Sequence, residues 1–229
     1  MGRVSWRSLN NRIVSCDRCP RLRAHCRHTA IRKRAGFSDW QYWGKPVPNL
    51  GDAGAAMLIV GLAPAAHGAN RTGRMFTGDR SGDFLYAALY RCGFASQPQA
   101  VNADDGLELI DVAITAAVHC APPANKPTRD EFDNCFEHMD QTFACMPRLR
   151  VVLCLGKLAT DVVLKLYQQR GWIEKRSSYP FAHGAKHQIA DTPTILCSYH
   201  PSQQNTFTGR LTETMMIAVL RRARRIISK

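Results

Sequence analysis

Met57-Leu-Ile-Val-Gly61 is an uninterrupted apolar run that ends in glycine, and a long polar loop follows it as far as Asp79. A short apolar run bounded by turn residues is typical of a strand that is buried on both faces of a sheet. The next segment, Ser81–Cys92, has the periodicity of an amphipathic helix. A buried strand, a loop and a helix form the repeating unit of a parallel α/β sheet.

The same alternation continues towards the C-terminus. Thr128-Arg-Asp-Glu131 has the pattern of a capping box, so a helix is predicted to begin there. We therefore expect an α/β fold, a three-layer α/β/α sandwich around a central, mainly parallel four-stranded sheet. The further predicted strands are Ile114–Val118, Val151–Gly156 and Thr194–Ser198, and the further predicted helices are Lys157–Gln168 and a final helix from Ser202 towards Ile227.

The length of 229 residues suits one domain with a substantial buried core. We expect a single domain over residues 1–229, with a basic N-terminal segment in residues 1–54 and the α/β core in residues 55–229. The stretch Phe37–Gly54, rich in Trp, Tyr, Pro and Gly, is predicted to be an irregular loop. Residues 169–191 are not assigned to an element, and the run Ala182–His187 within them is interpreted as a loop or a hairpin.

The charge of the chain is strongly positive, with 31 Lys and Arg against 18 Asp and Glu. Residues 1–34 hold ten of the basic side chains and one acid, and the last predicted helix ends in four arginines. A surface of this charge attracts a polyanion, and we expect that partner to be nucleic acid. The alternatives are contact with an acidic lipid and a charged surface that only keeps the protein soluble. The apolar runs are too short to span a bilayer and no secretory signal is present, so we expect a cytoplasmic, nucleoid-associated protein.

Three polar loops leave the carboxyl ends of predicted strands, namely residues 61–78, 119–127 and 199–209. In parallel sheets ligands bind beyond these ends, so the loops locate the site. The glycines of the first loop permit close approach of a ligand, and Phe76 offers a flat face for stacking a base. Taken alone, this loop indicates either a small-molecule or phosphate site or a purely structural turn. The patterns of a P-loop, a nucleophile elbow and a zinc deaminase are all absent from the sequence.

Nine cysteines are many for a protein of a reducing compartment, where clustered cysteines indicate a metal or redox centre. Cys16 and Cys19 form a C-x2-C pair, and Cys120 and Cys135 lie fifteen positions apart on a strand end and the following helix. Two such pairs can close a site of four thiolates for an iron–sulfur cluster, with zinc as the alternative. Cys26 is a rival ligand. The remaining cysteines, Cys92, Cys145, Cys154 and Cys197, are expected to pack in the core.

His200 follows the last predicted strand, in Tyr199-His-Pro-Ser202. A lone histidine is more often structural than catalytic. Its position at the carboxyl end of a strand, before the start of a helix, favours a place in the site.

At this point three segments resemble the motifs of the family 5 (type b) uracil-DNA glycosylases: Gly61-Leu-Ala-Pro64 with the rest of its loop, Cys120–Pro127, and His200-Pro-Ser202. The segment from Cys16 through Cys19 is similar to that family's first cluster motif. The resemblance extends from about Cys16 to Thr212. It implies excision of uracil from DNA by hydrolysis of the N-glycosidic bond, in base excision repair.

The resemblance also implies roles for individual residues. Cys16, Cys19, Cys120 and Cys135 would hold a structural [4Fe–4S] cluster, and Phe76 would stack on the everted uracil. The other implied roles are catalysis for Asn125 and His200, contact with the substrate for Gly61, Ala63, Pro64 and Ser202, and a DNA wedge formed by Gln203, Gln204 and Asn205. The implied partner is double-stranded DNA, and also single-stranded DNA, that contains deaminated bases, bound by a monomer.

The group that activates water is the point of departure from related families, because Ala63 stands where they place Asp. The nearest polar residues in the loop are His67, Asn70 and Asp79. We expect Asn70 to position the attacking water. Asp79 is the alternative as a base, but it could instead fix the loop or cap the next helix. The apolar Ala63 also predicts activity on hypoxanthine or other deaminated bases.

Two alternatives remain at this stage. A non-enzymatic iron–sulfur or zinc DNA-binding regulator would need the cysteines and the basic surface, but not Phe76, Asn125 and His200 together. A hydrolase acting on free nucleosides would leave the basic surface unexplained.

Overall fold

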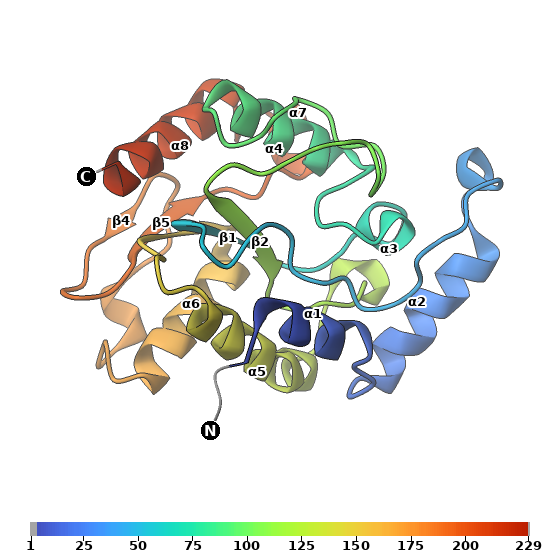
Figure 1. Ribbon diagram of the computed structural model, residues 1–229, viewed down its shortest axis with the longest axis horizontal. Helices are drawn as coiled ribbons and strands as arrows, with labels where there is room; N and C mark the ends of the chain where they lie inside the picture. Colours follow the sequence, from blue (N-terminus) through green and yellow to red (C-terminus); the bar gives the residue numbers. More distant parts are fainter. Residues whose placement is uncertain (1–3, 229) are drawn as a thin grey trace.

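The computed structural model describes residues 4–228, so that Arg3 of the basic segment lies outside them. The described residues form a five-stranded sheet in the order β2-β1-β3-β5-β4 (Figure 1). Parallel pairing joins β1 to β2 and β3, and β3 to β5. The parallel strands are β1 (Met57–Gly61), β2 (Val112–Ala116), β3 (Val151–Leu155) and β5 (Thr194–Ser198).

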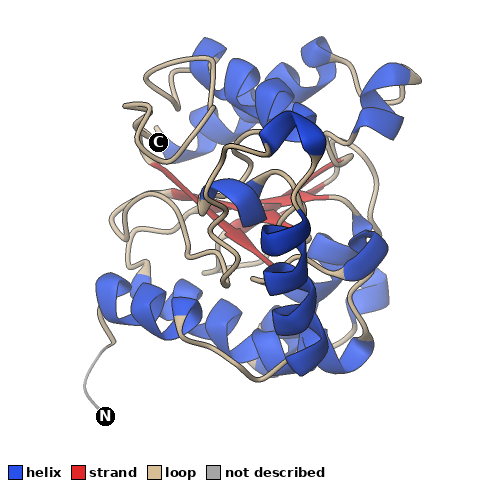
Figure 2. Ribbon diagram, turned by 90° about the vertical axis from the view of Figure 1, so that its right-hand side faces the viewer, coloured by secondary structure: helices blue, strands red, loops and turns tan. Residues whose placement is uncertain are grey.

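Helices cover both faces of the sheet, which confirms the three-layer α/β/α architecture (Figure 2). Alternate residues of β1 point to opposite faces, because successive side chains of a strand alternate. Met57 and Ile59 join the core under α4 (Arg80–Arg91) and α8 (Glu213–Ile227). Leu58 and Val60 join the core under α5 (Arg129–Cys145) and α6 (Lys157–Gln169). All five side-chain positions of β1 are buried, as its apolar run predicts.

The sheet differs from the predicted one by an additional strand. β4 (Lys186–His187) pairs antiparallel with β5 at the edge of the sheet. It lies in the run Ala182–His187, for which the sequence left a loop or a hairpin open. Two residues are too short to show an alternation of apolar and polar side chains, so no pattern could identify this strand.

The last predicted helix is in fact two helices. Ser202 precedes the short α7 (Gln203–Phe207), and α8 begins only after Thr212, whose side chain caps it. Gly209, between them, has a φ of 70°. This left-handed conformation ends a helix, and glycine adopts it at no steric cost. The predicted capping box is confirmed at Thr128 and Glu131.

The basic N-terminal segment forms α1 (Trp6–Val14) and α2 (Pro20–Arg32). Arg18 pairs with Glu137 at 2.6 Å, and Arg21 pairs with Glu131 at 2.7 Å, so both arginines tie the segment to α5. The short elements that complete the described chain are α3 (Ala69–Thr72) and the 3-10 turns η1 (Ala35–Phe37), η2 (Pro123–Asn125) and η3 (Arg176–Ser178). Within residues 4–228, no helix has the length and apolar character needed to cross a membrane.

Candidate active site

A narrow pocket lies at the carboxyl ends of the parallel strands, where the sequence located the site. Gly61 ends β1 and Ala116 ends β2, and His200 follows β5 by two residues. The strand-end loops from β1 and β5 thus meet at one pocket. Its lining residues are Gly61, Ala63, Pro64, Ala65, Ala69, Met75, Phe76, Asp79, Ser81, Ala116 and His200.

Phe76 lies in the wall of the pocket with a φ of 53°, a conformation that is uncommon for a residue with a side chain. Two glycines make room for it. A Cβ on Gly61 would lie 2.9 Å from the Phe76 ring, and a Cβ on Gly82 would lie 1.7 Å from the Phe76 carbonyl oxygen. Glycine at these positions therefore lets the ring face the pocket.

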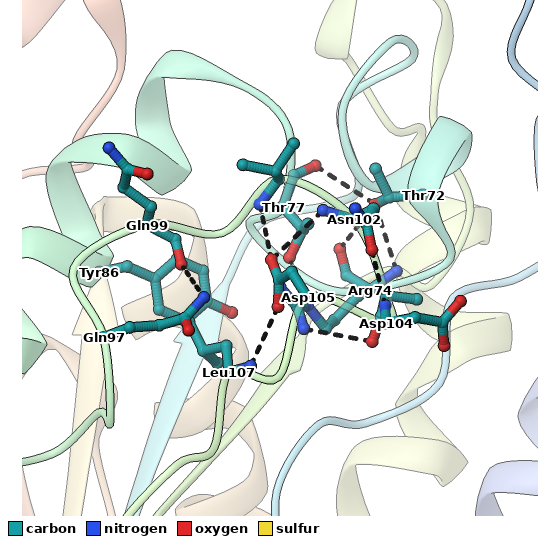
Figure 3. Close-up of polar contacts among 12 residues, drawn as sticks. Thr72, Arg74, Thr77, Tyr86, Gln97, Gln99, Asn102, Asp104, Asp105 and Leu107 are labelled. Carbon is teal, nitrogen blue, oxygen red and sulfur yellow. Dashed lines mark hydrogen bonds and ion pairs between the residues drawn. The ribbon is translucent and has the colours of Figure 1, made fainter.

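A buried polar network holds the loop on either side of Phe76 (Figure 3). The Arg74 guanidinium pairs with Asp105 at 2.7 Å, and its Nε donates to the Thr77 hydroxyl at 2.9 Å. Tyr86 donates to the Met75 carbonyl at 2.8 Å. Burial raises the pKa of Asp105, but the Arg74 side chain and two backbone N–H groups outweigh it and lower that pKa to about 2. The network keeps the strained Phe76 backbone in one conformation.

His200 faces Phe76 across the pocket, with ring centroids 5.9 Å apart and planes tilted by 32°. Asn205 of α7 donates to the His200 carbonyl at 2.8 Å, which fixes the turn after β5. Burial lowers the pKa of His200 to about 4. The imidazole is therefore neutral near pH 7 and carries a single N–H donor.

Asp79 has the capping role that was one of the alternatives for it from the sequence. It is the N-cap of α4 and accepts a hydrogen bond from the Gly82 N–H at 3.0 Å. It also lines the pocket with Phe76 and His200. Burial raises the pKa of its carboxyl group. Gly68 leaves the space for it, since a Cβ there would lie 2.0 Å from an Asp79 carboxylate oxygen.

Asn70 is fully buried and does not line this pocket. Its Nδ2 donates to the carbonyls of Cys26 and Ala66, at 3.4 and 3.3 Å. The side chain therefore points into the packing of α3 against α2, away from the reacting centre that the sequence analysis assigned to it. The sequence favoured Asn70 because an amide can orient a water and because Asp79 could instead cap the next helix, but residue type does not specify the direction of a side chain.

A wide groove of about 740 Å³ adjoins the pocket and shares Ala65 and Asp79 with it. Asn125, exposed and with a φ of 56°, lines this groove rather than the pocket. Gln203 lines it as well, whereas Ser202 lines neither cavity. The groove is also lined by His67, which the sequence offered as a polar residue of the loop. Its other basic and aromatic residues, to which the sequence assigned no role in the site, are Arg34, Phe37, Trp40, Arg71 and Arg80.

Arg71 supports the wall of the groove. Its guanidinium lies 3.9 Å from the ring centroid of Phe37 and 4.0 Å from that of Trp40. It donates to the carbonyls of His67 and Gly78, both at 2.8 Å. Arg71 thereby connects the 3-10 turn η1 to the loop that carries Phe76.

The four cysteines predicted as ligands line one small cavity, together with His119, His138 and Arg18 among others. Burial raises the pKa of the Cys135 thiol to about 12. The rival, Cys26, lies outside this lining, and its thiol donates to the Ala121 carbonyl at 3.7 Å. The N-terminal and central cysteine pairs therefore meet in space.

Within residues 4–228, no three histidine, cysteine or acidic side chains come together closely enough to hold a single metal ion. Thiolates that each bind a different iron of a cluster need not meet at one point. Four cysteine side chains around one cavity are the type of donor that an iron–sulfur cluster takes.

The fold is an α/β/α sandwich, and the pocket at the carboxyl ends of its parallel strands is lined by the Phe76 ring, the His200 imidazole and the Asp79 carboxyl group. A family model, "Uracil DNA glycosylase superfamily", matches residues 48–224. The chain belongs to the uracil-DNA glycosylase superfamily.

Within this superfamily the chain is similar to proteins named type-5 uracil-DNA glycosylase. It is 45% identical to that of Mycobacterium leprae, over 98% of this chain and 97% of the relative. The Thermus thermophilus protein is 45% identical over 93% of this chain and 94% of the relative. That of Pyrobaculum aerophilum is 44% identical over 93% and 89%. The non-enzymatic regulator considered from the sequence has no support from these relatives.

Proposed function

We propose that this protein excises uracil from DNA by hydrolysing the bond between the base and the sugar, as part of base excision repair. The relatives support the reaction and the substrate. The observation that carries the mechanism is the meeting of Phe76, His200 and Asp79 at one strand-end pocket. The nucleotide leaves the base stack to reach this pocket, at a cost of a few kcal/mol.

Phe76 and His200 act on the base. The ring of Phe76 stacks on the uracil, and the neutral His200 donates its N–H to O2 as negative charge develops on the leaving base. A donor that is already in place in a dry pocket stabilises such a charge without reorganisation. The Asn205 hydrogen bond to the His200 carbonyl keeps that donor in position.

Asp79 acts on the sugar side, in place of the predicted Asn70. As a carboxylate it accepts a proton from, or orients, the attacking water, and its charge stabilises the oxocarbenium-like sugar. The raised pKa brings this base closer to the working pH. Asn125, on the rim of the groove, is assigned to contact with the strand rather than with the water.

Gly61, Ala63 and Pro64 provide the apolar wall against the edge of the base. Because Ala63 has no polar group that could reject other bases, we infer that the pocket accepts hypoxanthine and other deaminated bases in addition to uracil. Equal inactivity on inosine- and xanthine-containing duplexes would exclude this wider range.

The groove is the surface that binds the damaged DNA strand. The protein acts there as a monomer, at the nucleoid. Arg34 and Arg80 are exposed and able to contact phosphates, and the half-buried Trp40 offers a ring for stacking. Gln203 and Gln204 of α7 form the wedge that fills the space of the everted base, with Ser202 at the start of the helix. Phe207 on the same helix is 75% exposed and is a further candidate for this wedge. Asn205, which holds His200, serves the pocket instead.

Cys16, Cys19, Cys120 and Cys135 would hold a [4Fe–4S] cluster in the cysteine cavity. Bound there, the cluster would fasten the N-terminal segment to the loop after β2. Desolvation raises the pKa values of the half-buried Cys19 and the buried Cys135, so these thiols become thiolates only beside a strong positive charge. A brown protein with visible thiolate-to-iron absorption supports this cofactor, while a colourless protein with one zinc contradicts it.

The test of the mechanism measures how fast the His200→Ala variant releases uracil from a uracil-containing duplex. The matched control is His28→Ala, which removes an exposed histidine. We expect kcat to fall about 10²–10³-fold in His200→Ala, because one donor to the leaving group is lost, with DNA binding retained. The control is expected to match the wild type. Unchanged base release in His200→Ala would overturn the assignment. Activity on free deoxyuridine with none on DNA would indicate a nucleoside hydrolase instead.

A further inference from the structure

Two buried histidines lie beside the proposed cluster ligands and have no role in the excision mechanism. His138 follows Cys135 by three residues on α5, so the two side chains lie on the same face of the helix. His119 directly precedes Cys120. Both histidines line the cysteine cavity, and their exposed fractions are only 3% and 2%.

The hydrogen bonds of these rings are incomplete. Nδ1 of His119 donates to the Val47 carbonyl at 2.7 Å, whereas its Nε2 has no partner among residues 4–228. Neither ring nitrogen of His138 has a hydrogen-bond partner within the same residues. The two rings meet edge to face at 5.8 Å. A neutral imidazole carries one N–H and one bare nitrogen, so His138 brings an unused donor to the cavity.

Burying such a donor without an acceptor costs free energy, and native structures rarely leave it so. The cavity that His138 lines contains four cysteine sulfurs. Two N–H groups already point at these sulfurs: the backbone N–H of His119 at 3.4 Å from Cys135 Sγ, and Asn134 Nδ2 at 3.7 Å from Cys19 Sγ. Sulfur that carries negative charge is a better acceptor than a neutral thiol.

We propose that His138 is a positioning residue that donates its N–H to a sulfur of the four-cysteine centre. This inference rests on the cluster proposed above. Hydrogen bonds to the sulfurs are one of the factors that set the potential of an iron–sulfur centre. His138 therefore stabilises the more negatively charged, reduced form of the centre and retards its loss in air. The Nδ1–H of His119 donates to the Val47 carbonyl, and the His119 ring, in edge-to-face contact with His138, orients the His138 ring.

The test compares full-length wild type with His138→Leu and His138→Gln, purified without oxygen. Leucine fills the space without a donor, and glutamine restores an N–H. The matched control is His187→Leu, which removes another ring whose buried Nε2 has no hydrogen-bond partner within residues 4–228 and which does not line the cysteine cavity. The measurements are iron and sulfide per chain, the rate at which visible absorption fades in air, and the midpoint potential.

We expect all variants to contain iron at the wild-type level. The absorption of His138→Leu is expected to fade several-fold faster and its potential to become more negative, with both values restored towards the wild type in His138→Gln. Wild-type values for His138→Leu would overturn the inference. So would loss of iron in both His138 variants with an unchanged circular dichroism spectrum, because that result would make His138 a ligand. An iron-free wild type that still excises uracil would refute the cofactor and this inference while leaving the proposed reaction intact.

Discussion

The rings of His200 and Phe76 lie 5.9 Å apart, although 124 positions separate these residues in the chain (200 − 76). One follows the last parallel strand and the other belongs to the loop after the first. The parallel order of the sheet brings both strand ends to the same edge. The distance leaves the rings close enough to contact one planar base together.

Replacing Phe76 by leucine is expected to lower kcat/KM on uracil-containing DNA by about ten- to hundredfold. Stacking of a base on an aromatic ring is worth about 1–3 kcal/mol, and leucine keeps the apolar volume but not the flat face. Single-turnover base release at several DNA concentrations measures the effect. Phe207→Leu, at an exposed position outside the pocket, separates a loss in the pocket from a loss in DNA contact. Wild-type kinetics in Phe76→Leu would contradict the stacking role.

The activity is expected to fall as the pH is lowered through the pKa of Asp79, which burial raises above its usual range. The water-directed role needs the carboxylate, so protonation removes it. His200 adds no acidic limb until about pH 4, since its pKa is lowered to that value. A profile of kcat against pH for wild type and Asp79→Asn measures this dependence, with the exposed Asp130→Asn as control. Asp79→Asn should be slow and lack the acidic limb, and a normal profile in that variant would exclude Asp79 as the base.

Gly82→Ala is expected to destabilise the protein by roughly 1–3 kcal/mol and to reduce excision. The new Cβ would lie 1.7 Å from the Phe76 carbonyl oxygen, so either α4 or the Phe76 loop must move. Thermal unfolding and base release measure the two effects. Gly36→Ala is the matched control, because nothing lies within 4 Å of a Cβ at that position. Equal melting temperatures for the two variants would show that the contact is relieved without cost.

Asp105→Asn is expected to lower the free energy of unfolding by about 3 kcal/mol near pH 7, because it leaves the buried Arg74 without its counter-charge. The folded pKa of Asp105, about 2, lies below its ordinary value of 3.8. The ion pair therefore stabilises the folded state fully at pH values above the ordinary pKa of 3.8, and this stabilisation disappears as the pH falls towards 2. Denaturant unfolding between pH 7 and pH 2 should show the difference between wild type and variant shrinking with acid. A constant difference would contradict the linkage.

Arg34→Ala and Arg80→Ala are each expected to weaken binding to DNA of any sequence and to reduce the salt slope by about 1. Both guanidinium groups are exposed on the groove beside the base pocket. Binding to an abasic-site duplex at several salt concentrations measures the slope. Arg221→Ala, exposed on α8 and outside the groove lining, tests whether any loss of positive charge has the same effect. Identical slopes for all three variants would show that the groove is not the path of the strand.

Residue periodicity was sufficient for the layers and most of the elements. The apolar run Met57–Gly61 is a strand buried on both faces, and the capping box at Thr128 starts a helix as expected. These features depend on local sequence, because the burial of alternate side chains and the satisfaction of helix-end N–H groups involve neighbours in the chain. The two-residue strand β4 and the break at Gly209 carry too little local signal and were missed.

The sequence by itself determined the α/β/α class, the three strand-end loops and the residues that could do the chemistry. Only the tertiary structure decided which of them meet: Asp79 rather than Asn70 lines the pocket, and Cys26 lies outside the cavity that the four other candidate cysteines line. The reason is that spacing along a loop says nothing about the direction of a side chain. That direction depends on contacts between distant segments, such as the packing of α3 against α2 that turns Asn70 towards the Cys26 carbonyl.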